Sequence, residues 1–214
     1  MLGILFDLDG TLLDTLEDLT DAVNYALRRH GYAERTLAEV RRFVGNGTAR
    51  LIKLSVPEGA DYAPVLETYL EYYPAHSQIK TGPYKGILEA LETVRSKYPV
   101  AVVSNKLDAA VKTMCADYFG DVYARGESSD CPRKPAPDML YRAMEAVGAD
   151  SCIYVGDSEV DVVTARNAGG KCISVTWGFR DEEELVAAGA EHICREPAQL
   201  PGIIEKIAEE HYGK

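Results

Sequence analysis

The sequence has no long apolar run, few aromatic residues and only one tryptophan among its 214 residues. No window is apolar for long enough to cross a bilayer, so a membrane-spanning helix is not expected. The amino terminus enters an apolar stretch without a basic region or a cleavage pattern, so we expect no secretory signal peptide. A soluble globular fold is therefore expected.

Positive charge is also scarce. Lysine and arginine number 23 against 34 aspartates and glutamates, which gives a formal net charge of -11 at pH 7. Such an excess of negative charge repels polyanions, so neither nucleic acid nor an anionic membrane is expected as a partner. An anionic small molecule would have to be attracted locally, by a metal ion or by a few lysines and arginines.

The cysteines are odd in number, far apart and mostly within apolar runs. We expect them to be free and buried, which fits a reducing, cytoplasmic location. The sequence has no cluster of histidine and cysteine with the spacing of a zinc site. The five are Cys115, Cys131, Cys152, Cys172 and Cys194.

Short apolar segments alternate with helical patterns over most of the chain, and 46% of the residues are hydrophobic. This alternation predicts an α/β fold with a Rossmann-like parallel sheet buried between helices. The expected strands cover residues 2–6, 100–103, 122–124, 152–155 and 172–175, and the expected helices cover 86–97, 108–119, 138–147, 159–168, 181–189 and 198–210.

Residues 15–82 differ, because they contain helical patterns and no convincing strand. Thr36 and Glu39 have the spacing of a capping box at a helix start. We therefore expect a core domain of residues 1–14 and 83–214, interrupted by a helical cap domain of residues 15–82. Because this insert follows the first strand directly, it should lie over the carboxyl edge of the sheet as a lid.

Polar residues follow the strands at this edge, where open α/β sheets bind their ligands. Each has an ordinary structural interpretation alone: serine caps turns, most lysines are solvated, and the helix dipole favours acidic residues at a helix start. Their joint placement is less easily explained in that way. They are Asp7 and Asp9 after the first strand, Ser104 and Asn105 after the second, Lys134 in a loop, and Asp157 and Asp161 after the strand of residues 152–155.

Together these residues resemble the motifs of the haloacid dehalogenase superfamily, over essentially the whole chain. The insert is similar to that superfamily's helical cap of the first type, and Phe43–Gly47 and Val175–Phe179 resemble the phosphoglycolate phosphatase group. The resemblance implies a phosphatase that acts on a small phosphorylated metabolite through an aspartyl-phosphate, with 2-phosphoglycolate as the best single substrate. The matching motifs are Asp7-Leu8-Asp9-Gly10-Thr11, Ser104-Asn105, Lys134-Pro135 and Gly156-Asp157 through Asp161.

The resemblance also implies individual roles. Asp7 is the nucleophile and Asp9 the general acid and base, while Ser104 and Lys134 assist at the phosphoryl group. Mg²⁺ is held by Asp7, the carbonyl of Asp9 and Asp157, with Asp161 behind them. Asn105 would contact the phosphoryl group, and Thr11 is counted with the substrate-binding residues while bracing the loop after the first strand. Asn46, Thr48 and Arg50 of the cap would meet the rest of the substrate, although the ordinary interpretation of Arg50 is that it faces solvent.

Charge counting from the residues supports a metal. Asp7, Asp9, Asp157 and Asp161 would meet an anionic substrate, and each pair of like charges costs about 4 kcal/mol at about 4 Å and an effective dielectric of about 20. Lys134 alone cannot balance them, so the site requires a divalent cation and favours a protonated Asp9. Oxygen ligands suit Mg²⁺.

Other functions share these motifs. A sugar-phosphate mutase or a pyrophosphatase of the same superfamily remains open, whereas Asp9 argues against its dehalogenase and phosphonate-cleaving branches. A phospho-aspartate signalling receiver domain also combines Asp, Ser or Thr and Lys around Mg²⁺, but needs no large helical insert. The expected protein is a monomer or homodimer.

Overall fold

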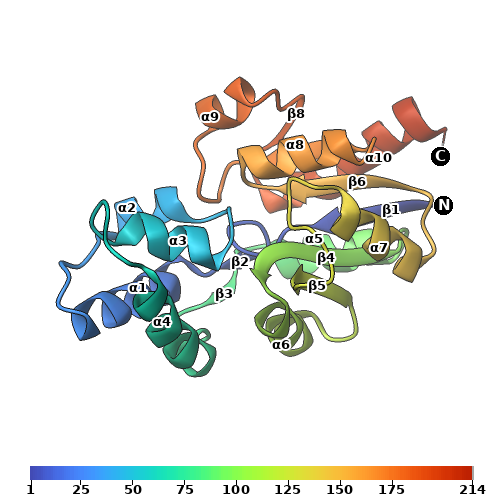
Figure 1. The fold of residues 1–214 in the computed structure, drawn as a ribbon. Coiled ribbons are helices and arrows are strands. Elements are labelled where there is room, and N and C mark those ends of the chain that lie inside the picture. The colour runs from blue at the N-terminus through green and yellow to red at the C-terminus, as the bar shows by residue number, and fades with distance from the viewer. Residues whose placement is uncertain (214) are drawn as a thin grey trace.

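The computed structural model describes residues 1–213, as an α/β core joined to a separate group of helices (Figure 1). The core holds a six-stranded sheet in the order β5-β4-β1-β6-β7-β8, and every neighbouring pair is parallel. The predicted α/β fold is confirmed. The strands are β1 (Leu2–Phe6), β4 (Val100–Leu107), β5 (Tyr123–Glu127), β6 (Ser151–Gly156), β7 (Lys171–Val175) and β8 (His192–Cys194).

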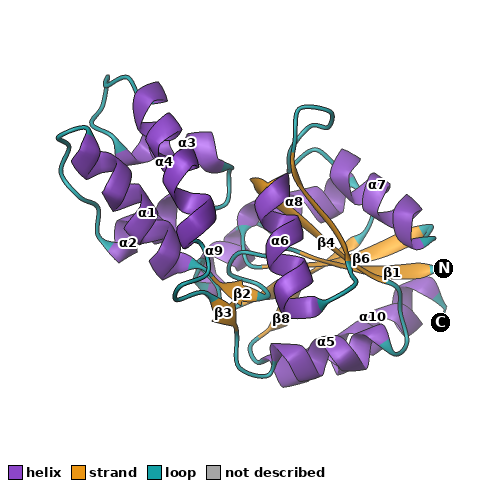
Figure 2. Ribbon diagram, turned by 90° about the horizontal axis from the view of Figure 1, so that it is seen from below, coloured by secondary structure: helices purple, strands orange, loops and turns teal. Residues whose placement is uncertain are grey.

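Alternate side chains of the sheet enter two apolar clusters, one on each face. In β1, Ile4 and Phe6 pack with residues of α5, α6 and α10, whereas Leu5 packs with residues of α7 and α8. Figure 2 shows α5 and α10 along one side of the sheet and α7 on the other. The helices of the core are α5 (Ile87–Arg95), α6 (Asp108–Phe119), α7 (Asp138–Val147), α8 (Glu159–Asn167), α9 (Glu182–Ala187) and α10 (Leu200–Tyr212), with a 3₁₀ turn at Pro197–Gln199.

The helical insert lies beyond the carboxyl end of the sheet (Figure 1). The chain enters and leaves it through a short antiparallel pair, β2 (Leu13–Asp14) and β3 (Gly82–Pro83). The buried carboxylate of Asp18 accepts hydrogen bonds from the backbone N–H groups of residues 79–81, which ties the returning chain to the first helix. Its helices are α1 (Leu16–Arg29), α2 (Leu37–Phe43), α3 (Thr48–Ser55) and α4 (Ala63–His76).

Predictions that depend on residues close together in the sequence are confirmed. The capping box of Thr36 and Glu39 forms as expected at the start of α2. All five cysteines are free, as predicted, and four of them are buried, whereas Cys172 is half-buried. Within the part of the chain that the structure describes, no helix combines the length and apolar character that crossing a bilayer demands.

The strands differ from the sequence prediction in two ways. The second strand does not end at Val103 but continues to Leu107, because its polar continuation is buried at the sheet edge and pairs with β5 through Leu107 and Glu127. The β2–β3 pair and β8 were not predicted. Each is two or three residues long, too short to show a periodic pattern, and forms only because a distant partner strand is present.

Candidate active site

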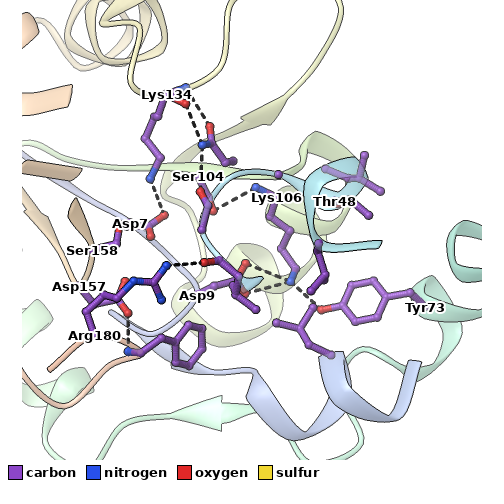
Figure 3. A pocket seen from close by; sticks show the side chains of 18 of the residues that line it. Asp7, Asp9, Thr48, Tyr73, Ser104, Lys106, Lys134, Asp157, Ser158 and Arg180 are labelled. Atoms are coloured by element: carbon purple, nitrogen blue, oxygen red, sulfur yellow. Dashed lines mark hydrogen bonds and ion pairs between the residues drawn. The ribbon is translucent and has the colours of Figure 1, made fainter. Parts of the chain in front are cut away.

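The end of β4 and the loops after β1, β6 and β7 meet the Lys134 loop and the insert around one cavity (Figure 3). Two glycines allow this close approach. Gly10 has a φ of +80°, and a Cβ there would lie 2.3 Å from Asp157 Oδ2. A Cβ on Gly178 would lie 2.3 Å from the carbonyl oxygen of Gly10. The turn after β1 therefore fits against the loops after β6 and β7 only without side chains at these positions.

Lys134 is buried between two carboxylates of the core. Its Nζ lies 2.9 Å from Asp7 Oδ1 and 2.8 Å from Asp161 Oδ1, and it donates a 2.7 Å hydrogen bond to Tyr154 Oη. Burial opposes the charge of Lys134, but Asp161 and Asp7 raise its pKa well above the ordinary value. The ammonium is therefore permanently charged and fixed in position.

The carboxylates beside Lys134 are destabilised as anions. Burial raises the pKa of Asp7 to about 7; Lys134 opposes this shift, whereas Asp161 and Asp9 add to it. The pKa of Asp157 is also well above its usual range, through burial first and then through Asp161 and Asp7. One lysine thus leaves excess negative charge that a further cation would stabilise.

The donor set is suited to a hard metal ion. One oxygen from each of Asp7, Asp157 and Asp161 lies within 4.8 Å of the others, and all three residues are buried. Asp161 is already occupied, since Ser158 N and Oγ donate to Oδ2 and Lys134 donates to Oδ1. Asp157 Oδ2 accepts from Phe179 N at 2.6 Å. Asp157 Oδ1 and the Asp7 carboxylate are the oxygens left to hold a cation such as Mg²⁺.

Asp9 lies on the other side of the cavity, in contact with a lysine that the sequence analysis missed. Lys106 Nζ lies 2.9 Å and 3.2 Å from the two carboxylate oxygens of Asp9, and Thr15 Oγ1 donates to Oδ1 at 2.7 Å. Lys106 also donates a 2.6 Å hydrogen bond to Tyr73 Oη of α4. Its position two residues after Ser104, on the same face of a strand, would have revealed it had the strand been extended to Leu107.

Ser104 and Asn105 both line the cavity, but their side chains are used differently. Ser104 Oγ accepts a 3.3 Å hydrogen bond from the backbone N–H of Lys106. Asn105 exchanges hydrogen bonds with the backbone of Lys134, at 2.9 Å and 3.0 Å, and donates to the carbonyl oxygen of Gly45 in the insert at 3.1 Å. The amide of Asn105 therefore joins the Lys134 loop to the insert rather than facing a ligand.

The insert contributes different residues from those expected. Thr48 lines the cavity, but Asn46 and Arg50 do not, and Arg50 is exposed. On α3, Leu51 lies three residues after Thr48 and shares its face, whereas Arg50 points elsewhere. The structure therefore does not bring Asn46 or Arg50 to the site.

Thr11 is buried behind the cavity instead of lining it. Its carbonyl oxygen accepts a hydrogen bond from Trp177 Nε1 at 3.0 Å. This contact braces the turn after β1. The structure does not bring Thr11 into contact with the cavity.

Arg180 is a second residue that the sequence analysis missed. Its Nε pairs with Glu159 at 2.9 Å, and its two Nη atoms donate to the carbonyl oxygens of Arg41 and Val44 in the insert. Because Arg180 is buried, these contacts connect the loop after β7 with α2 away from bulk solvent. Arg180 is far in sequence from its two partners in the insert, so no sequence pattern predicted these contacts.

Comparison with known proteins places this geometry in a family. The family model described as haloacid dehalogenase-like hydrolase matches residues 4–175. A phosphoglycolate phosphatase of Cereibacter sphaeroides strain ATCC 17025 is 36% identical over 84% of this chain and 87% of its own. One from Rhodobacter capsulatus is 33% identical over 95% of this chain and 96% of its own.

A solved structure agrees with these sequences. A protein from Lactobacillus delbrueckii subsp. bulgaricus, assigned by prediction as a phosphoglycolate phosphatase, superposes with a TM-score of 0.89 and 36% identity. The match covers 94% of this chain and 97% of that one. The chain therefore belongs to the haloacid dehalogenase-like hydrolases, and within them it is a phosphoric monoester hydrolase.

Proposed function

We propose that the protein hydrolyses a small phosphate monoester, with 2-phosphoglycolate as the substrate, in a Mg²⁺-dependent reaction through an aspartyl-phosphate. The observation that carries this proposal is the position of Lys134, held between Asp7 and Asp161 beside a carboxylate pair with oxygens left for a metal. Such an arrangement keeps a carboxylate in place next to fixed positive charge, as phosphoryl transfer requires.

Asp7 is the nucleophile in this proposal. Its Oδ1 faces Lys134 as an ion pair but makes no hydrogen bond of good geometry within residues 1–213, so the oxygen is not committed elsewhere. Attack by the carboxylate on phosphorus forms an acyl phosphate and releases the alcohol, and water then opens the acyl phosphate. Lys134 and the Ser104 hydroxyl would stabilise the phosphoryl oxygens during both steps.

Asp9 is the general acid and base. It gives a proton to the leaving alkoxide and takes one from the attacking water. Thr15 and Lys106 orient its carboxylate through the contacts already described. Tyr73 adds a connection from the insert, so the position of this carboxylate depends on both parts of the molecule.

Asp7, Asp157 and the Asp9 carbonyl would hold the metal, and Asp161 would orient Lys134 behind them. Bound Mg²⁺ supplies positive charge to the nucleophile and to the phosphoryl oxygens. Lys106 changes the charge count made from the sequence, because the four carboxylates of the site are now accompanied by two lysines rather than one. One divalent cation then balances the site with Asp9 ionised before the substrate enters. The negative charge of the bound substrate then favours uptake of a proton by Asp9, and this is the proton that the leaving alkoxide receives.

The insert acts as a lid in this proposal, with the β2–β3 pair as its hinge. Arg180 and Asn105 connect the core to the insert close to the cavity, and their contacts would have to break for the site to open. The domain limits of 1–14, 15–82 and 83–214 remain a prediction that fits this hinge.

The test is a screen for phosphate release with Mg²⁺ across 2-phosphoglycolate, sugar phosphates, pyrophosphate and nucleotides. We expect 2-phosphoglycolate to have the highest kcat/KM. A preference for pyrophosphate, or interconversion of sugar phosphates without net hydrolysis, would show that the pyrophosphatase or mutase alternative is correct. Stable phosphorylation without turnover would instead indicate a receiver domain.

A further inference from the structure

Three cations line the cavity, and they differ in the groups that they contact. Lys134 directs its ammonium at Asp7, Asp161 and Tyr154. Arg180 uses Nε and both Nη atoms on Glu159 and on two backbone carbonyls. Lys106 donates to both oxygens of the Asp9 carboxylate and to Tyr73 Oη, so among residues 1–213 its ammonium faces a single carboxylate, whereas Lys134 faces two.

Tyr73 adds a second donor at the same place. Its oxygen accepts the 2.6 Å hydrogen bond from Lys106, so its own phenol proton is available to a further acceptor. Burial raises the pKa of Tyr73 well above the ordinary value, and Asp9 and Asp18 add to this shift, so the phenol stays protonated. Figure 3 shows Lys106 between Asp9 and Tyr73, on the side of the cavity that faces the insert.

The surrounding wall offers little else to an anion. Besides Tyr73 and two glycines, the insert lines the cavity with Leu19, Val44 and Leu51, and Thr48 and Tyr69 add only neutral hydroxyls. Lys106 itself is 7% exposed, in an environment that screens charge poorly. An anionic group that entered beyond the phosphoryl site would therefore find its positive charge at Lys106.

We propose that Lys106 and Tyr73 together bind the second anionic group of the substrate, a carboxylate one carbon away from the phosphate ester oxygen. This inference rests on the proposed function and assigns the part of the site that distinguishes an acid from a neutral alcohol. Lys106 belongs to the core strand β4 and Tyr73 to the insert helix α4. The carboxylate thus joins the two parts, and a substrate without it makes one contact fewer with the lid.

The test compares two esters that differ only at this group, 2-phosphoglycolate and 2-hydroxyethyl phosphate. We expect wild-type kcat/KM to be higher for the acid. Loss of a charged hydrogen bond is expected to reduce this preference about 10- to 100-fold in Lys106→Met, chiefly through KM for the acid. Tyr73→Phe should reduce it about 3- to 10-fold. Lys106→Arg should keep more of the preference than Lys106→Met, because the charge is retained.

Lys112→Met and Tyr72→Phe are the matched controls, because Lys112 is exposed on α6 and neither residue lines the cavity. Both should keep the wild-type preference. If the Lys106 and Tyr73 variants lowered kcat/KM for both esters by one factor, these residues would act through Asp9 alone and the inference would be wrong. Tyr73→Phe decides the matter if Lys106→Met fails to fold.

The outcomes separate this inference from the proposed function. A wild-type enzyme that hydrolyses both esters equally well with Mg²⁺ is still a phosphatase, but it has no subsite for a carboxylate. A wild-type protein that hydrolyses neither these esters nor p-nitrophenyl phosphate would overturn the proposed function, and this inference with it.

Discussion

The two halves of the cavity differ in the charge and polarity of the side chains that line them. The half at the sheet edge carries three buried aspartates and a lysine whose donors are all engaged. The half toward the insert is apolar, apart from Tyr69, Tyr73 and Thr48, and it meets the core through Lys106, Asn105 and Arg180. In the proposed function the core performs the chemistry and the insert selects the substrate. Changes at the sheet edge should therefore abolish activity, and changes in the insert should alter preference.

The largest effect is expected from Asp7→Asn. An amide cannot replace the attacking carboxylate, so kcat/KM should fall by about 10⁴-fold or more for every ester tested. Phosphate release measures the loss, and circular dichroism checks the fold. The control Asp21→Asn changes an exposed aspartate of the insert and should be nearly silent. Survival of a tenth of the activity in Asp7→Asn would exclude this residue as the nucleophile.

Removal of divalent cations should have the next largest effect. Without a cation the carboxylates around Lys134 repel both one another and the substrate, so turnover after EDTA treatment should fall by about 10³-fold. Added Mg²⁺ should restore it and should also raise the Tm. Unchanged turnover in EDTA would contradict the metal site.

The buried carboxylate of Asp7 should make the stability of the metal-free protein depend on pH. Its pKa rises from 3.8 to about 7 on folding, so between these values the native state binds more protons than the unfolded state. The contribution of Asp7 to the free energy of unfolding is therefore full at low pH and is lost as pH rises from about 4 to about 7, by up to about 4 kcal/mol.

Denaturant unfolding at several pH values in EDTA measures this slope. Asp7→Asn should flatten it, because an amide does not titrate. Mg²⁺ should flatten it as well, by stabilising the ionised carboxylate. Equal slopes in wild type and Asp7→Asn would show that other groups control the pH dependence.

Arg180→Met tests the connection between the two halves. The variant loses the hydrogen bonds to the carbonyls of Arg41 and Val44 and leaves Glu159 unpaired, so the closed arrangement should be less populated. We expect KM to rise by about 10-fold, the loss expected for one or two net hydrogen bonds, with a smaller change in kcat. A fall in kcat alone would place Arg180 in the chemistry instead.

The smallest effect is expected from Arg50→Ala. Arg50 is exposed and does not line the cavity, so kcat/KM for 2-phosphoglycolate should change by less than about twofold. A rise in KM of tenfold would restore the sequence-based prediction that Arg50 meets the substrate, and would require a different placement of α3. Thr48→Ala, on the same helix but inside the cavity, is the informative comparison.

Much of the core could be predicted from the amino-acid sequence. The alternation of apolar segments and helices indicated the parallel sheet, and parallel strands bring their carboxyl ends to one edge, so Asp7, Asp157 and Lys134 were expected together before any contact was known. Such motifs are local, and their meeting follows from topology alone.

The contacts between the core and the insert could not be predicted in this way. Lys106 contacts Tyr73, and Arg180 contacts the carbonyl oxygens of Arg41 and Val44, across separations of 33 to 139 residues. The rotation of each insert helix decides whether Thr48 or Arg50 faces the cavity, and that rotation depends on how the whole apolar interior packs. The sequence by itself determined the sheet and the charges at its edge. Only the tertiary structure decided which side chains the insert places over them, because packing between distant segments leaves no periodic signal in the chain.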